Sequence, residues 1–171
     1  MIELTNRLEQ FIGEIPKVEL HLHLEGAVPL ETLFGFIQNR GNNKLIKNLE
    51  DLKKRLVYSN FTQFIKVWLW KNSFITEYED FEELSYQVLK SLSQQNVKYV
   101  EAFYSPRDFT LRNRKLSACG ITESLIEGKK RAFDDFGIQS ELIVDIVRDY
   151  GPRMGMGLIK ELSGYLGRGL I

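Results

Sequence analysis

The two histidines of this sequence, His21 and His23, lie two residues apart in the stretch KVELHLHLEG at 17–26. Polar and apolar residues alternate along this stretch without a break, which predicts a β-strand whose imidazoles project from one face. Imidazole is a favoured ligand for zinc and related divalent metals, so this face could hold one ion. Two histidines satisfied by ordinary hydrogen bonds, or on a half-exposed edge, are the alternative that the spacing alone leaves open.

The opposite face of this strand is apolar. It carries Val18, Leu20, Leu22 and Leu24. A parallel strand that helices cover on both sides is normally apolar on both faces. The histidine face must therefore point into a polar environment. The strand as a whole, however, is too apolar to lie at a solvent-exposed edge of a sheet. The interior of a barrel, open where its strands end, satisfies both requirements and strengthens the prediction of a metal site.

The rest of the chain alternates predicted helices with predicted strands. Gly26 ends the first strand, and β-branched and aromatic residues predict two more strands at 97–106 and 139–147. A capping-box spacing at 76–79 predicts the start of one helix. Helical spacing of apolar residues predicts the other helices at 4–12, 29–37, 48–56, 61–70, 122–136 and 152–166.

Strands separated by helices indicate βα units and a parallel sheet. We therefore predict an α/β fold that consists of the first three βα units of a (β/α)8 TIM barrel, with extra helices between strands 1 and 2. Such a barrel typically needs about 250 residues. Residues 1–171 should then form the N-terminal part of a single metal-dependent barrel domain, incomplete in this chain. Leu170 and Ile171 are expected to begin a fourth strand.

The composition excludes several classes of protein. The 23 basic and 23 acidic residues balance, so there is no bulk electrostatic case for nucleic acid or membrane partners. Cys119 is the one cysteine, so no intrachain disulfide can form and a reducing compartment fits. The charged N-terminus lacks the apolar core of a signal peptide, and no apolar run approaches the ~18 residues of a membrane span. We expect a cytoplasmic protein.

His23, Leu24 and Glu25 match the H-x-E half of the signature of the zinc-dependent nucleobase deaminases. That signature also requires P-C-x-x-C to complete the zinc site. A chain whose one cysteine is Cys119 cannot supply it. This class is therefore excluded for the residues present.

Three motifs cover nearly the whole chain: PKVELHLHLEGA at 16–27, VKYVEAFYSP at 97–106 and ELIVDIVR at 141–148. Together they resemble the adenosine/adenine/AMP deaminase family of zinc amidohydrolases. The first motif is highly specific, and the other two are supportive. Members of that family are metal-dependent (β/α)8 barrels that hydrolyse the 6-amino group of a purine to a 6-oxo group and release ammonia. The resemblance is strongest to adenosine deaminase, so the implied reaction is adenosine to inosine.

The resemblance implies roles for three residues of the first motif. His21 and His23 correspond to two ligands of one Zn²⁺ ion. Glu25 matches an acidic residue that hydrogen-bonds the ribose 5′-hydroxyl in adenosine-specific members, and it shares the parity of the histidines along the strand. A carboxylate that orients one of the histidines is the alternative role for Glu25.

The resemblance also implies contacts with the substrate. Phe61, Phe64 and Trp68 match the apolar helix that gates the purine pocket, with Trp68 in place of the usual phenylalanine. Plain core packing is the alternative for such a stripe. Ser105 matches the serine of a second-strand Y-S-P motif. Phe103 stands where an arginine is common, which leaves the contacts of the second strand open.

Half of the implied site is missing from these residues. The family adds a later histidine and aspartate as ligands, and a glutamate and another histidine for proton transfer. We therefore expect no catalytic residue within this chain, and we expect the 171 residues alone to be inactive and prone to self-association. The full-length protein is expected to be a zinc-dependent adenosine deaminase acting on a small purine nucleoside. Adenine or another 6-aminopurine is the alternative substrate, and a different amidohydrolase or an inactive fragment is the second alternative.

Overall fold

The structure is a computed structural model that describes residues 2–41 and 45–171. Its three parallel strands, in the order β1-β2-β3, are β1 (Lys17–His23), β2 (Val97–Tyr104) and β3 (Gln139–Val144). Its α-helices are α1 (Ile2–Glu14), α2 (Leu24–Ala27), α3 (Leu30–Asn39), α4 (Leu49–Arg55), α5 (Phe61–Asn72), α6 (Tyr78–Ser93), α7 (Pro106–Thr110), α8 (Ala118–Phe136) and α9 (Gly151–Leu162). The α/β alternation and the extra helices between the first two strands are as predicted.

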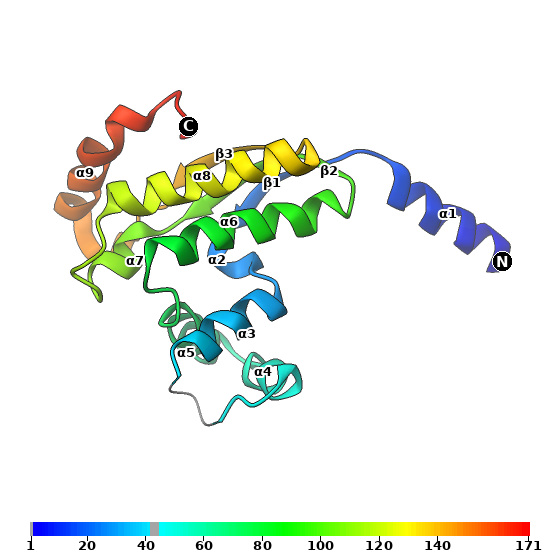
Figure 1. Cartoon of the computed structure of the whole chain (residues 1–171), viewed down its shortest axis with the longest axis horizontal. Helices are drawn as coiled ribbons and strands as arrows, with labels where there is room; N and C mark the ends of the chain where they lie inside the picture. The colour runs from blue at the N-terminus through cyan, green and yellow to red at the C-terminus, as the bar shows by residue number, and fades with distance from the viewer. Residues whose placement is uncertain (1, 42–44) are drawn as a thin grey trace.

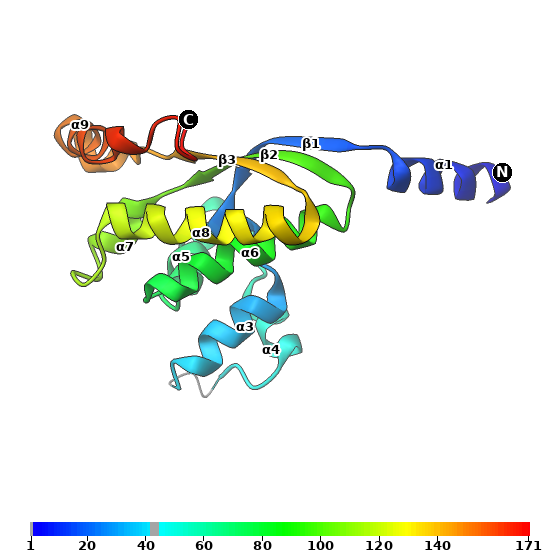
Figure 2. The same ribbon diagram turned by 45° about the horizontal axis from the view of Figure 1, so that its top comes forward.

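Helices α6 and α8 lie side by side across one face of the sheet, as Figures 1 and 2 show. Their contact is close, because a Cβ atom added at Gly128 of α8 would stand 2.1 Å from the carbonyl oxygen of Glu82 in α6. The main core lies between these helices and the sheet and includes Val100, Leu125 and Leu142. This helical layer therefore supports β2 and β3 from one side.

Helix α8, with 19 residues, has an apolar face that packs in the main core and includes Ile121, Leu125 and Ala132. It ends at Gly137, whose φ of 67° lies in the left-handed region that glycine adopts without strain. Among the residues that the structure describes, neither α8 nor any other helix is long and apolar enough to cross a membrane.

Helices α3, α4 and α5 project away from this layer (Figure 1). A small second core holds α3 to α4, and it consists of Leu33, Ile37, Ile46 and Leu52. Helix α5 begins where the side chain of Asn60 accepts a hydrogen bond of 2.9 Å from the N–H of Gln63, an N-cap that fixes its first turn. These insertions place α5 opposite the carboxyl ends of the strands.

Strand β1 is less regular than its alternating sequence predicts. Its register with β2 shifts between Glu19 and Leu22, where β1 holds one more residue than β2, as in a β-bulge. Next to this shift the N–H of His21 donates to Oε1 of Glu19 at 3.1 Å. The strand then ends at His23, so the prediction of an unbroken strand through residue 25 is wrong. The chain turns there into α2, which brings the carboxylate of Glu25 into the interior, where it accepts a backbone N–H.

The two edges of the sheet differ. On the apolar face of β1, Val18 is 62% exposed and Leu20 is 54% exposed, because α1 extends away from the sheet instead of covering it (Figure 2). At the other edge, Leu170 pairs in parallel with Leu142, and the N–H of Ile171 donates to the carbonyl oxygen of Leu142 at 2.9 Å. Residues 170–171 thus lie beside β3, where the fourth strand was predicted to begin, but they form a single bridge there and not a strand.

Candidate functional site

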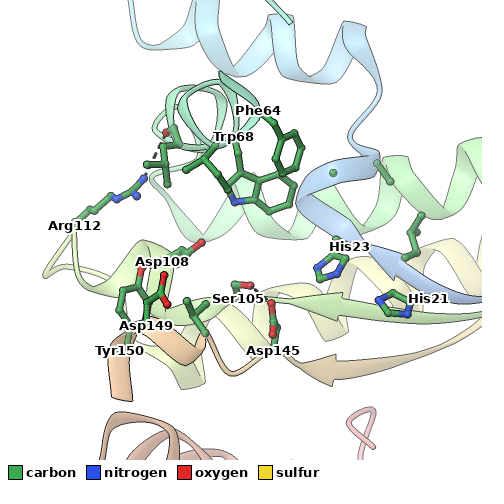
Figure 3. Close-up of a pocket in the computed structure, with 16 residues that line it drawn as sticks. His21, His23, Phe64, Trp68, Ser105, Asp108, Arg112, Asp145, Asp149 and Tyr150 are labelled. Atoms are coloured by element: carbon green, nitrogen blue, oxygen red, sulfur yellow. Dashed lines mark hydrogen bonds between the residues drawn. The ribbon is translucent and has the colours of Figure 1, made fainter. Parts of the chain in front are cut away.

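A cavity of about 690 Å³ lies between helix α5 and the carboxyl ends of the three strands (Figure 3). Each strand contributes a polar side chain at or just beyond its end: His23 from β1, Ser105 after β2 and Asp145 after β3. Parallel strands commonly place ligand-binding groups at this edge, since all their carboxyl ends meet there. The full lining is His21, Leu22, His23, Gly26, Ala27, Phe64, Ile65, Trp68, Leu69, Ser105, Asp108, Arg112, Asp145, Val147, Asp149 and Tyr150.

Both histidines face this cavity, with ring centroids 5.6 Å apart. The ring of Phe103, from the neighbouring strand, stacks on both of them, with centroids 4.7 Å from His21 and 5.4 Å from His23. Phe103 therefore occupies the place where the sequence resemblance would put an arginine. An aromatic ring there restricts both imidazoles without competing for their nitrogen atoms.

The spacing of the two imidazole rings is compatible with one zinc ion. With Zn–N bonds of roughly 2.0–2.1 Å and tetrahedral geometry, two imidazoles on one ion have centroids roughly 5 Å apart, close to the spacing of His21 and His23. Zinc sites in enzymes use three protein ligands, however. Among residues 2–41 and 45–171, no group of three or more histidine, cysteine, aspartate or glutamate side chains is arranged to hold a metal. The described residues thus bring two imidazoles together, which is fewer than the three protein ligands of a zinc enzyme.

Helix α5 supplies the aromatic wall. Phe64 and Trp68 line the cavity with ring centroids 5.9 Å apart, and the indole of Trp68 meets the ring of His23 edge-on at 6.4 Å. Phe61, at the first position of α5, is 75% exposed and does not belong to the lining. Its ring contacts Phe64 with centroids 6.1 Å apart, so it extends the aromatic row beyond the cavity. The structure thus brings two of the three predicted aromatic residues to the site.

One wall of the cavity is acidic. Oγ of Ser105 donates to Oδ2 of Asp145 at 2.9 Å, and the hydroxyl of Tyr150 donates to Oδ1 of Asp108 at 2.7 Å. Burial, helped by the hydrogen bond to Asp108, raises the pKa of Tyr150 to about 12. Among the described residues that line this cavity, Arg112 is the one arginine or lysine. These groups offer hydrogen-bond donors and acceptors to a polar ligand.

Glu25 is 2% exposed and is not part of the cavity lining. Its Oε1 accepts the N–H of Ser105 at 2.8 Å, which links the turn after β1 to the turn after β2. Burial raises the pKa of Glu25 to about 7, against the lowering effects of that N–H and of the nearby charge of Lys71. Burial also lowers the pKa of Lys71 to about 8, against the attraction of Glu25.

Sequence reasoning missed the acidic wall and the buried lysine. Asp145 lies inside the strand predicted at 139–147, which in the structure ends at Val144. An acidic residue near the end of that predicted strand was therefore a usable signal. Asp108 lies in the short helix α7 and Arg112 in the turn that follows it, and no periodicity indicates which way they point. From sequence alone, Lys71 is expected on the surface of an amphipathic helix, because lysine is rarely buried.

The sequence matches a known protein family. The profile of the family described as Adenosine deaminase matches residues 16–165. The chain is 28% identical over 160 residues to an adenine deaminase of Bordetella avium, a match that covers 92% of the chain and 49% of that protein. It therefore spans about half the length of this curated relative.

Two solved structures have the same fold over this half. An amidohydrolase from Burkhoderia ambifaria with bound Zn superposes with a TM-score of 0.78 at 24% identity, over 91% of this chain and 42% of that one. Arabidopsis ADAL complexed with IMP gives a TM-score of 0.79 at 20% identity, over 95% and 49%. The three βα units correspond to the first part of the barrel in such amidohydrolases, as predicted. The chain belongs to the adenosine deaminase family.

Proposed function

We propose that the protein containing this chain is a zinc-dependent hydrolase that replaces the 6-amino group of a purine with oxygen and releases ammonia. Residues 1–171 would form the N-terminal part of its single barrel domain. The observation that carries this proposal is that the imidazoles of His21 and His23 face the same cavity as the aromatic rings of Phe64 and Trp68. Family membership and the zinc in an amidohydrolase neighbour support it.

In this proposal His21 and His23 hold one Zn²⁺ ion, whose chemistry is to activate water for attack on the purine C6. Phe64 and Trp68 would hold the planar purine between apolar faces and keep bulk water from the reacting carbon. Ser105 already donates a hydrogen bond to Asp145, so its hydroxyl oxygen would accept a hydrogen bond from the polar edge of the base. We assign the general acid and base to residues outside this chain.

The substrate that we place first is adenine. The relative from Bordetella avium is an adenine deaminase. Glu25, the residue expected to bind the ribose of adenosine, does not line the cavity. Adenosine, implied by the sequence resemblance, is the alternative, and Oε2 of Glu25 would then be the acceptor for its 5′-hydroxyl. That oxygen is buried, and within the described part of the chain it has no hydrogen-bond partner.

The test is an assay of ammonia release from adenine, adenosine and AMP by the zinc-loaded protein in its longest natural form. We expect turnover of adenine to hypoxanthine, abolished when zinc is removed and restored when it is added back. Glu25→Gln should leave KM for adenine unchanged; a rise in KM for adenosine alone would assign the sugar contact to Glu25. No ammonia from any 6-aminopurine would refute the proposed function.

A further inference from the structure

Lys71, near the end of α5, is buried at 7% exposure among groups that constrain its ammonium on several sides. Nζ donates to Oδ1 of Asn72 at 2.8 Å and to the backbone carbonyl oxygen of Glu25. It also lies 4.2 Å from the ring centroid of Trp68, in a cation–π contact. Burying a lysine is costly unless its charge is paired and hydrogen-bonded. If Lys71 only filled space, a methionine of similar length could replace it, and the three contacts of its ammonium would have no explanation.

The contacts of Lys71 join the parts of the cavity wall. Glu25 lies two residues after His23, so the bond to its carbonyl oxygen ties α5 to the turn that ends β1. The carboxylate of the same residue accepts the N–H of Ser105 and extends the link to the end of β2. On the other side, the ammonium lies against the indole that contacts His23.

Gly26 shows how tightly this turn and the indole fit. A Cβ atom at Gly26 would lie 3.4 Å from the ring of Trp68 and 3.7 Å from Cβ of His23. Figure 3 shows Trp68 directed from α5 toward His23 across the cavity. A small rotation of α5 about its axis would therefore change the width of the space between the aromatic wall and the histidines.

We propose that Lys71 is a positioning residue, which clamps α5 to the turn after β1 and so holds the indole of Trp68 at a fixed place beside His23. Hydrophobic packing alone would stabilise α5 without fixing its rotation, whereas two directed hydrogen bonds and a ring contact fix it. The purine part of this inference rests on the proposed function; the clamp itself does not.

The test compares Lys71→Met with Lys66→Met, a matched change at an exposed lysine of the same helix. In a background in which Trp70 and any tryptophan outside residues 1–171 are replaced by phenylalanine, acrylamide should quench Trp68 more strongly after Lys71→Met. Amide hydrogen exchange at residues 24–27 should become about tenfold faster, the size expected when a hydrogen bond to a charged group is lost. Lys66→Met should change neither readout. Unchanged quenching and exchange in folded Lys71→Met would overturn the clamp.

The kinetic readout separates positioning from general loss of stability. Lys71→Met should raise KM for adenine about tenfold while kcat changes less than about twofold, because binding is misaligned while the zinc ligands stay in place. A fall in kcat with KM unchanged would show a loss of active protein only and would overturn the role in positioning. If Lys71→Met does not fold, Asn72→Ala, which removes one acceptor of the ammonium, should produce the same changes at smaller size, and the absence of those changes would count against the proposal.

If the wild-type protein deaminates none of the purines, the proposed function fails, but quenching and hydrogen exchange still decide whether the clamp exists. Conversely, an active enzyme in which Lys71→Met behaves like Lys66→Met keeps the proposed function and refutes the clamp.

Discussion

Gly128→Ala should destabilise the fold strongly, because it forces apart the two helices that support the sheet. The added Cβ would stand 2.0 Å from Oγ of Ser85 and 2.1 Å from the backbone carbonyl oxygen of Glu82. The serine can rotate, but only by giving up its 2.9 Å bond to the carbonyl oxygen of Leu125, and the carbonyl of Glu82 can move only with α6 itself. Overpacking of this kind typically costs 1–3 kcal/mol, and a clash with backbone places it at about 3 kcal/mol or more. Alanine offsets about 1 kcal/mol of this through its better helix propensity.

The chain offers a matched control for this prediction at Gly35, inside α3, where an added Cβ meets nothing within 4 Å. Gly35→Ala should therefore leave stability unchanged or raise it by up to about 1 kcal/mol. Urea unfolding at low protein concentration, followed by tryptophan fluorescence, measures both variants against the wild type. Equal midpoints for Gly128→Ala and Gly35→Ala would refute the close contact between α6 and α8.

Three further predictions follow from exposure and charge. Trp68→Ala should weaken adenine binding yet cost less than the ~3–5 kcal/mol of a fully buried aromatic truncation, since Trp68 is only partly buried; a large loss of stability with unchanged binding would return this residue to ordinary core. Burial lowers the pKa of Lys71 from 10.5 to about 8, so the unfolded chain binds more protons between these values. The free energy of unfolding should therefore rise with pH in this window, by at most about 1.4 kcal/mol per unit, and Lys71→Met should abolish the rise. The 171-residue chain alone should be inactive and should self-associate through the exposed face of β1 at Val18 and Leu20, which sedimentation velocity can measure; a monomer that turns over adenine would contradict this.

The parts of the site that were predictable from sequence depend on local rules. Period-two alternation puts side chains of equal parity on one face, and His21 and His23 do share the cavity. Helical spacing likewise put Phe64 and Trp68 on one side of α5. The same spacing could not show that Phe61 lies at the helix start, outside the cavity.

The residues that sequence reasoning misplaced depend on where the chain turns and on contacts between distant segments. Glu25 continues the parity of the histidines, but the strand ends at His23 and the turn of α2 directs its carboxylate to the N–H of Ser105, 80 positions along the chain. The capping box forms one residue later than its spacing suggested, between Glu77 and Asp80, because Asp80 also reaches the N–H of Thr76. The position of Glu25 is not visible without its distant partner Ser105, whereas the capping box is decided by local contacts between residues three and four positions apart.

A zinc titration of wild type, His21→Ala and His23→Ala tests whether His21 and His23 hold zinc at the purine site. The protein in its longest natural form should bind one zinc ion. Removing even an indirect partner of a metal ligand typically lowers affinity 10–100-fold, so each loss of a ligand should lower it by at least about tenfold. Circular dichroism should show that both variants keep the fold. Wild-type zinc affinity in either variant would contradict the account.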